Sequence, residues 1–126
     1  MTPRRIQWII AAIFLGLGGW CLIAPMSVAE LGLRPSYLTN APVLPIMMGA
    51  FGAQAVLFGL ITIFVEYNRR AFMALGAAML PFFWFDYHFY FVEPVFNELI
   101  LIDALGNLVL MFLAFWGYRL LSRIGS

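Results

Sequence analysis

Long apolar stretches, separated by short polar connections, make up almost the whole chain. They run over residues 6–24, 43–65, 71–91 and 96–121, and no charged residue interrupts the first two. About 20 mainly apolar residues are enough for a membrane-spanning helix, roughly twice what a barrel strand needs. Because lipid offers the backbone no hydrogen-bond partner, such stretches are predicted to be helices. The pattern predicts an all-α integral membrane protein, a single domain built as a four-transmembrane-helix bundle.

The connections predict how these helices are joined. Ser27-Val28-Ala29-Glu30 has the spacing of a capping box, which favours a short interfacial helix after the first span. A plain loop is the alternative for this segment. The third and fourth stretches are separated only by a short connection around Pro94-Val95, and so they are expected to be antiparallel neighbours.

Composition supports a membrane setting. The chain is 64% hydrophobic and 10% charged, whereas soluble domains carry about 25% charged residues. A net charge of +1 argues against a nucleic-acid partner. Arg4-Arg5 and Ser27-Val28-Ala29 resemble a secretory signal, but residues 6–24 are longer than its usual apolar core, which predicts a first membrane helix instead. The single cysteine, Cys21, cannot form an internal disulfide and is expected to be a small buried apolar residue.

The arginines predict the orientation of the bundle. All seven cations are arginines, and Arg34 alone falls on the side of the first connection. The others share the opposite side: Arg4, Arg5, Arg69, Arg70, Arg119 and Arg123. Cytoplasmic loops are enriched in Lys and Arg. We therefore expect a bacterial-type inner (plasma) membrane protein with both termini in the cytoplasm and the 93–98 connection outside.

Small residues predict where the helices approach one another, because they allow close packing in lipid. The first stretch has Ala12, Gly16 and Gly19; the second has Gly49, Gly52, Ala53 and Gly59; the third has Ala74, Gly76, Ala77 and Ala78. We expect these positions to pack the helices of one protomer, and a dimer face at Gly49–Ala53 is the alternative.

Ionisable groups gather between residues 82 and 107. Ionisable residues at membrane depth are functional candidates, and the candidates for proton transfer here are Asp86, His88, Glu98 and Asp103. Asp86 and Asp103 are equally distant from the connection, and so we expect them at the same depth. Two carboxylates held close in a poor solvent cannot both ionise cheaply, so one takes up a proton or a cation joins them. We expect Asp103 to face the bundle interior and to meet a polar partner from the third helix or the Arg34 loop.

The aromatic residues from 82 to 91 have two interpretations. They form an interfacial belt, or they line a flat apolar pocket whose candidate ligand-binding residues are Trp84, Tyr87, Tyr90, Asn107, Gln54 and Arg34. Gln54 and Asn107 are expected to make interhelical hydrogen bonds. Arg34 is expected to turn towards the outer carboxylates, or else to be solvated. One histidine and no Glu-x-x-His pair argue against a metal site, and no cofactor is expected.

Three short motifs are similar to those of the small four-helix membrane proteins of the DoxX-like group. They are Gly18-Gly19-Trp20 leading to Pro25, the following Leu31-Gly32-Leu33, and Met47-Met48-Gly49-Ala50-Phe51-Gly52 at the start of the second stretch. The shared layout covers nearly the whole chain and implies a four-helix membrane bundle. Some members of that group are linked to quinone-coupled oxidation as accessory subunits, which implies a supporting role here. No catalytic motif of the group matches, and no functional residue is carried over.

The sequence leaves three classes of function open. The leading hypothesis is a non-catalytic membrane protein, either an accessory subunit of a larger membrane complex or homo-oligomer, or a binder of an apolar molecule such as a quinone or lipid. A membrane-embedded isomerase or redox-partner enzyme that uses the four acidic and histidine candidates is the alternative. A channel or transporter is a further alternative. It would have to be oligomeric, because four helices are few to enclose a path alone.

Overall fold

The computed structural model describes residues 1–124, in which every regular element is helical and no strand occurs. In chain order the elements are α1 (Pro3–Ile23), α2 (Pro25–Gly32), the 3-10 turn η1 (Pro35–Tyr37), α3 (Val43–Phe64), α4 (Arg69–Ala78), α5 (Leu80–Tyr87), the π-helical turn η2 (His88–Val92) and α6 (Ile100–Arg123). The helices α1, α3 and α6 are long and apolar enough to cross a membrane. The all-helical class and its membrane-compatible character are thus confirmed.

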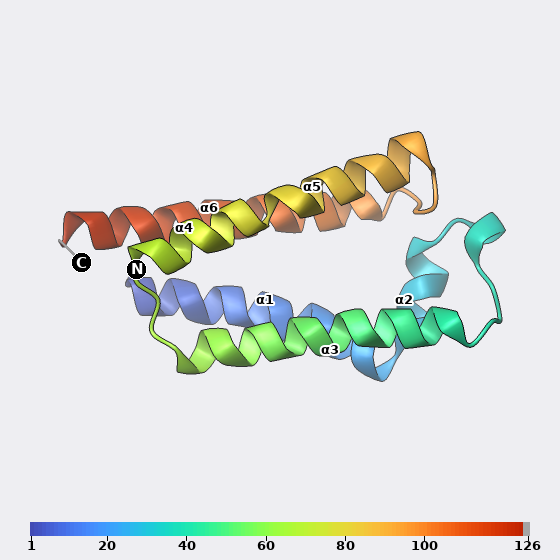
Figure 1. Cartoon of the computed structure of the whole chain (residues 1–126), viewed down its shortest axis with the longest axis horizontal. Coiled ribbons are helices and arrows are strands. Elements are labelled where there is room, and N and C mark those ends of the chain that lie inside the picture. The colour runs from blue at the N-terminus through green and yellow to red at the C-terminus, as the bar shows by residue number, and fades with distance from the viewer. Residues whose placement is uncertain (125–126) are drawn as a thin grey trace.

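The third apolar stretch is divided, where the sequence predicted one helix over residues 71–91. α4 ends at Ala78, and α5 begins at Leu80 with Pro81 in its first turn. Proline has no N–H to donate and its ring crowds the carbonyl of the preceding turn, so a regular helix cannot run through it. The two pieces and η2 nevertheless follow one another alongside α6, as Figure 1 shows. α6 itself begins at Ile100, four residues later than the predicted residue 96.

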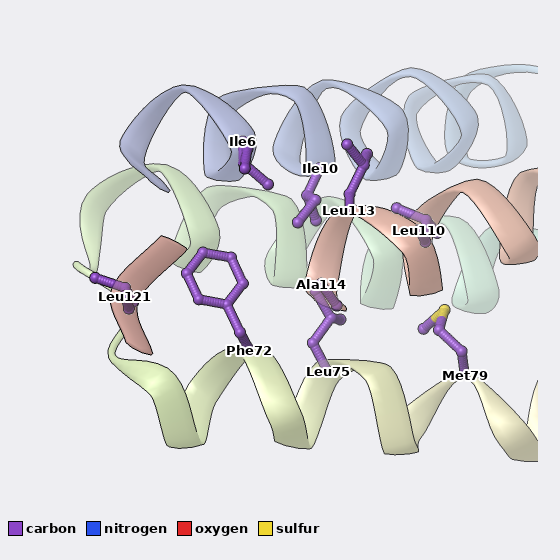
Figure 2. Close-up of a cluster of buried hydrophobic side chains, with 9 residues drawn as sticks. All are labelled: Ile6, Ile10, Phe72, Leu75, Met79, Leu110, Leu113, Ala114 and Leu121. Atoms are coloured by element: carbon purple, nitrogen blue, oxygen red, sulfur yellow. The ribbon is translucent and has the colours of Figure 1, made fainter. Parts of the chain in front are cut away.

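Two antiparallel pairs make up the molecule. α1 lies beside α3, and the α4–α5 segment lies beside α6, with the N-terminus, the C-terminus and the start of α4 at one end (Figure 1). At that end a cluster of buried apolar side chains joins the two pairs (Figure 2); it consists of Ile6, Ile10, Phe72, Leu75, Met79, Leu110, Leu113, Ala114 and Leu121. Since side chains of α1, α4 and α6 meet there, the pairs form one bundle.

Glycines allow α1 and α3 to approach closely. A methyl group added at Gly18 would come within 2.7 Å of Ala55 Cβ and 2.8 Å of the Gly52 carbonyl oxygen. Gly52 and Gly59 have equally little room, which confirms the predicted role of these two residues. Gly16, Gly19 and Gly49 have open space instead, and there the packing prediction was wrong. The sequence pattern placed the contact face of α1 on Gly16 and Gly19, and missed Gly18.

Buried polar groups of α1 satisfy the end of α3. Gln7 is 1% exposed; its Nε2 donates to the carbonyls of Thr62 (3.0 Å) and Val65 (2.6 Å), and its Oε1 accepts from the Tyr67 N–H (2.8 Å). Arg4 donates to the carbonyls of Ile63 and Val65. A helix C-terminus leaves four carbonyls without partners, and its partial negative charge attracts a cation. The role of Gln7 was not predicted.

At the opposite end, residues 31–34 and 95–97 hold the two pairs together. The Arg34 N–H donates to the Val95 carbonyl (2.8 Å) and the Asn97 N–H donates to the Gly32 carbonyl (2.9 Å), around an antiparallel bridge between Leu33 and Phe96. The Asn97 side chain adds a bond to the Leu31 carbonyl (2.7 Å). We call this arrangement the outer clasp.

The short helix predicted after the first span is α2, which confirms the helical alternative. Its start differs from the predicted capping box, because Pro25 occupies the first helical turn and Ala24 is the cap residue. Ser27 therefore lies inside the helix and makes no capping hydrogen bond. Proline is favoured at the first helical position because its missing N–H would have no partner there.

Candidate functional site

Three polar side chains meet between α5 and α6. The Asn107 Nδ2 donates to Asp86 Oδ2 across 3.0 Å and to Asp103 Oδ2 across 3.3 Å. Asp86 and Asn107 are 5% and 7% exposed, and Asp103 is half-buried one turn before Asn107 on α6. Asp86 and Asp103 thus lie level in the hairpin, as predicted. The interhelical hydrogen bond of Asn107 is also confirmed. Asp103 accepts from this shared amide, which lies on α6 itself and not on the third helix or the Arg34 loop, where the prediction placed its partner.

Asp86 has an oxygen without a partner. Within residues 1–124, Asp86 Oδ1 is buried and accepts no hydrogen bond. The one ion pair in this part of the chain joins His88 Nε2 and Glu93 Oε2 at 3.8 Å, so no cation lies within 4.0 Å of Asp86. A buried acceptor left unpaired costs about 1–3 kcal/mol, more when it is charged, so such a group in a native structure needs an explanation.

Asp86 lines a cavity of about 160 Å3 between α5, η2 and α6. Its other walls are apolar or aromatic: Phe83, Tyr87, Tyr90, Phe91, Ile100, Leu101 and Ala104. We call this cavity the Asp86 groove. Tyr87, Phe91 and Leu101 are exposed at its edge, so the groove opens on the outer surface of the bundle. A larger hollow of about 560 Å3 lies beside Met1, Trp8 and Ile9, but no buried polar side chain lines it.

The π-helical turn η2 shapes one end of the groove. The Glu93 N–H donates to the His88 carbonyl, five residues earlier, at 2.8 Å. Such turns are rare and occur frequently at functional sites. Tyr90 of this turn lines the groove together with Asp86. Glu93, just after the turn, pairs with His88.

The remaining proton-transfer candidates do not join this site. His88 stacks on Trp84 with ring centroids 4.9 Å apart and faces Glu93. Glu98 is exposed in the turn before α6, and neither it nor His88 lines the groove. The four catalytic candidates therefore do not form one constellation. Trp84 is likewise exposed and outside the groove.

Arg34 is placed differently from the prediction. Its Nε donates to the Phe96 carbonyl (2.8 Å), and its guanidinium lies 5.6 Å from the centre of the Tyr90 ring. No carboxylate within residues 1–124 pairs with it, so the predicted contact with the outer acidic groups was wrong. The outer clasp explains this, because it holds the Arg34 backbone against Val95 and directs the side chain along Phe96 to Tyr90.

Gln54 is also placed differently from the prediction. It lies on an exposed face of α3 and its side chain makes no hydrogen bond within the described residues, so the predicted interhelical bond was wrong. The face of α3 that packs on α1 carries Gly52, Ala55 and Gly59. Gln54 falls between these residues in the sequence but lies on an exposed face of the helix. A polar residue on a long apolar helix can therefore face outwards when its neighbours supply the packing.

No three His, Cys, Asp or Glu side chains within residues 1–124 are grouped closely enough to hold a metal ion. Comparison of the chain with protein-family models, with curated proteins and with solved structures finds no match. The likeness to the DoxX-like group thus stays a prediction. The chemistry of the Asp86 groove is what bears on function: its walls are apolar except for Asp86, one of whose carboxylate oxygens accepts no hydrogen bond.

Proposed function

We propose that the chain is a four-span protein of a bacterial-type inner membrane with both termini in the cytoplasm. The helical segment from Arg69 to Val92 supplies the remaining span, since it is as long as the roughly 20 residues that a crossing needs. Arg4, Arg69 and Arg123 lie at the same end of the bundle as the termini (Figure 1). This placement supports the orientation that the positive-inside rule predicts.

Within that setting we propose that the protein binds an apolar small molecule with a polar head group in the Asp86 groove. The observation that carries the proposal is Asp86, which lines an otherwise apolar cavity and whose buried Oδ1 accepts no hydrogen bond. Ligand sites are typically apolar concavities with a few placed polar groups. A head group that donates a hydrogen bond would satisfy Asp86, while the apolar body covers the aromatic walls.

The positions of the acidic candidates favour binding over proton-transfer catalysis. An enzyme of that kind needs its acid and base within reach of one substrate. Asp86 lines the groove, whereas Glu98 and His88 do not. A binder needs only the one free acceptor and the apolar walls.

Photolabelling tests this proposal. The protein in liposomes is irradiated with 4-benzoylbenzyl alcohol, an apolar probe with a hydroxyl head, and the labelled peptides are mapped by mass spectrometry. We expect label on the groove walls contributed by α5 and α6, and its loss when Asp86 is replaced by leucine. Glu98→Gln, which changes an exposed carboxylate, is the matched control. Label spread evenly over α1 and α3 would contradict the proposal.

A further inference from the structure

The hydrogen bonds around Asp86 show a surplus of acceptors. The side-chain amide of Asn107 has two N–H groups, and its Nδ2 donates to Asp86 Oδ2 and to Asp103 Oδ2. Asp86 Oδ1 accepts no hydrogen bond. No arginine or histidine lies within ion-pair distance of Asp86 or Asp103 in residues 1–124. Two carboxylates therefore share one neutral amide in a poorly solvated place. Within residues 1–124, no side-chain donor other than the Asn107 amide and no cation pairs with these two carboxyl groups.

We propose that the ligand of the Asp86 groove is an organic ammonium ion, a protonated amine on an apolar or aromatic body. This inference rests on the proposed function and specifies its ligand class. The N–H of the ammonium donates to the Asp86 carboxylate, and its charge offsets that of the carboxylate pair. A charged donor and a charged acceptor form stronger hydrogen bonds than neutral groups do.

The walls of the groove suit a cation as well. Phe83, Tyr87 and Phe91 contribute aromatic rings around Asp86. The face of an aromatic ring attracts a cation, by roughly 0.5–1 kcal/mol at exposed sites and more where water is excluded. The protein already uses this interaction at the outer end of the groove, where Arg34 lies over Tyr90. Arg34 is not within ion-pair distance of Asp86, so the Asp86 end is left for the ligand.

The size and opening of the groove limit the ligand further. Drug-sized ligands occupy about 300–1,000 Å3, whereas this groove holds about 160 Å3. It therefore takes an amino group and one ring or a short chain, and any longer tail extends past the exposed Tyr87 and Phe91 into lipid. An arylalkylamine matches these dimensions.

The experiment compares three molecules of similar shape. They are 2-phenylethylamine, which is charged and donates N–H bonds; 2-phenylethanol, which donates but is neutral; and trimethyl(2-phenylethyl)ammonium, which is charged but has no N–H. Binding to the full-length protein in a nonionic detergent is measured at pH 7 by saturation-transfer NMR, with empty micelles as the blank. We expect the amine to bind at least tenfold more tightly than the alcohol, and several-fold more tightly than the quaternary ion.

Variants assign the effect to the groove. Asp86→Asn keeps the shape and an oxygen for Asn107, and it should weaken amine binding at least tenfold. Leu101→Trp fills the groove from α6 without changing Asp86 and should do the same, which keeps the test decisive if Asp86→Asn does not fold. Glu98→Gln should leave amine binding unchanged. Each variant is first checked for a native elution volume.

Different outcomes overturn different parts of the inference. Equal binding of the alcohol and the amine would remove the requirement for charge while leaving a binding groove in place. Equal binding of the quaternary ion would remove the N–H bond to Asp86. Amine binding that persists in Asp86→Asn and in Leu101→Trp would place the amine elsewhere. Photolabelling of the groove walls with 4-benzoylbenzyl alcohol tests the proposed function separately.

Discussion

Asn107 on α6 donates a hydrogen bond to Asp86 on α5 across 3.0 Å, and the same amide nitrogen reaches Asp103. This contact is the polar link between two apolar helical segments. It fixes the rotation of α5 relative to α6, because an amide and a carboxylate meet only at one register. It also holds Asp86 beside the groove, with the second carboxylate oxygen buried and without a hydrogen-bond partner.

Replacing Asn107 tests the strength of this link. Asn107→Leu leaves Asp86 and Asp103 without their donor, and a buried acceptor left unpaired costs about 1–3 kcal/mol. We expect a lower midpoint of thermal unfolding in detergent. Gln54→Leu, at an exposed position on α3, is the control and should leave the midpoint unchanged or raise it. An Asn107→Leu protein as stable as the parent would show that the link is not needed for folding.

Replacing Asp103 separates shape from charge. Asp103→Asn conserves the side-chain shape and should leave the unfolding midpoint nearly unchanged. Asp103→Leu orphans one N–H of Asn107 and should destabilise the protein, but less than Asp86→Leu, because Asp103 is half-buried and Asp86 is 5% exposed. Chemical unfolding of the three variants in the same detergent measures the order. If Asp103→Leu were the most destabilised, Asp103 and not Asp86 would be the main partner of Asn107.

The close packing of α1 on α3 should be disrupted by a larger side chain at some glycines of α3 and not at others. A side chain at Gly52 would overlap the α1 backbone at Gly18 and Leu22, so Gly52→Val should push the helices apart. Overpacking typically costs about 1–3 kcal/mol, and more where only backbone could move. Gly49→Val, on the same helix but in open space, is the matched control. Similar losses of stability in both variants would contradict the packing described here.

Gln7 is expected to be a structural residue at the end of α3. Gln7→Leu removes its bonds to the Thr62 and Val65 carbonyls and to the Tyr67 N–H, while keeping its approximate volume. The connection between α3 and α4 should then exchange its amide hydrogens faster, because an unsatisfied backbone group in a dry place favours local opening. Hydrogen-exchange mass spectrometry of residues 60–70 measures this. Unchanged exchange there, in a variant that folds, would refute it.

Membrane orientation is open to chemical labelling. In a Cys21→Ala background, cysteines at the exposed positions Glu98 and Ile124 should react with an impermeant thiol reagent from opposite sides of sealed vesicles. In the proposed orientation Ile124 lies on the cytoplasmic side, because the arginines near both termini favour that side. Labelling of both positions from the same side would exclude the four-span topology, because an odd number of crossings separates the outer connection from the C-terminus.

The sequence by itself determined the helical class, the membrane-compatible helices and the common depth of Asp86 and Asp103. These depend on one-dimensional quantities: the length of an apolar run, the rise per residue and the distance from a short turn. Gly52 and Gly59 were also predicted correctly as packing residues, since small side chains in a spanning helix mark close approaches.

Only the tertiary structure decided which face of each helix meets another. Gly18 packs and Gly16 does not, Gln54 faces outwards, and Arg34 reaches Phe96 and Tyr90 and no carboxylate. That one oxygen of Asp86 has no hydrogen-bond partner was likewise decided only by the tertiary structure. In helices apolar enough to cross a membrane, hydrophobicity does not mark the face that packs on another helix, because the side available to lipid is apolar as well. Rotation about the helix axis is therefore set by side chains of the neighbouring helices, which meet only when the chain is folded.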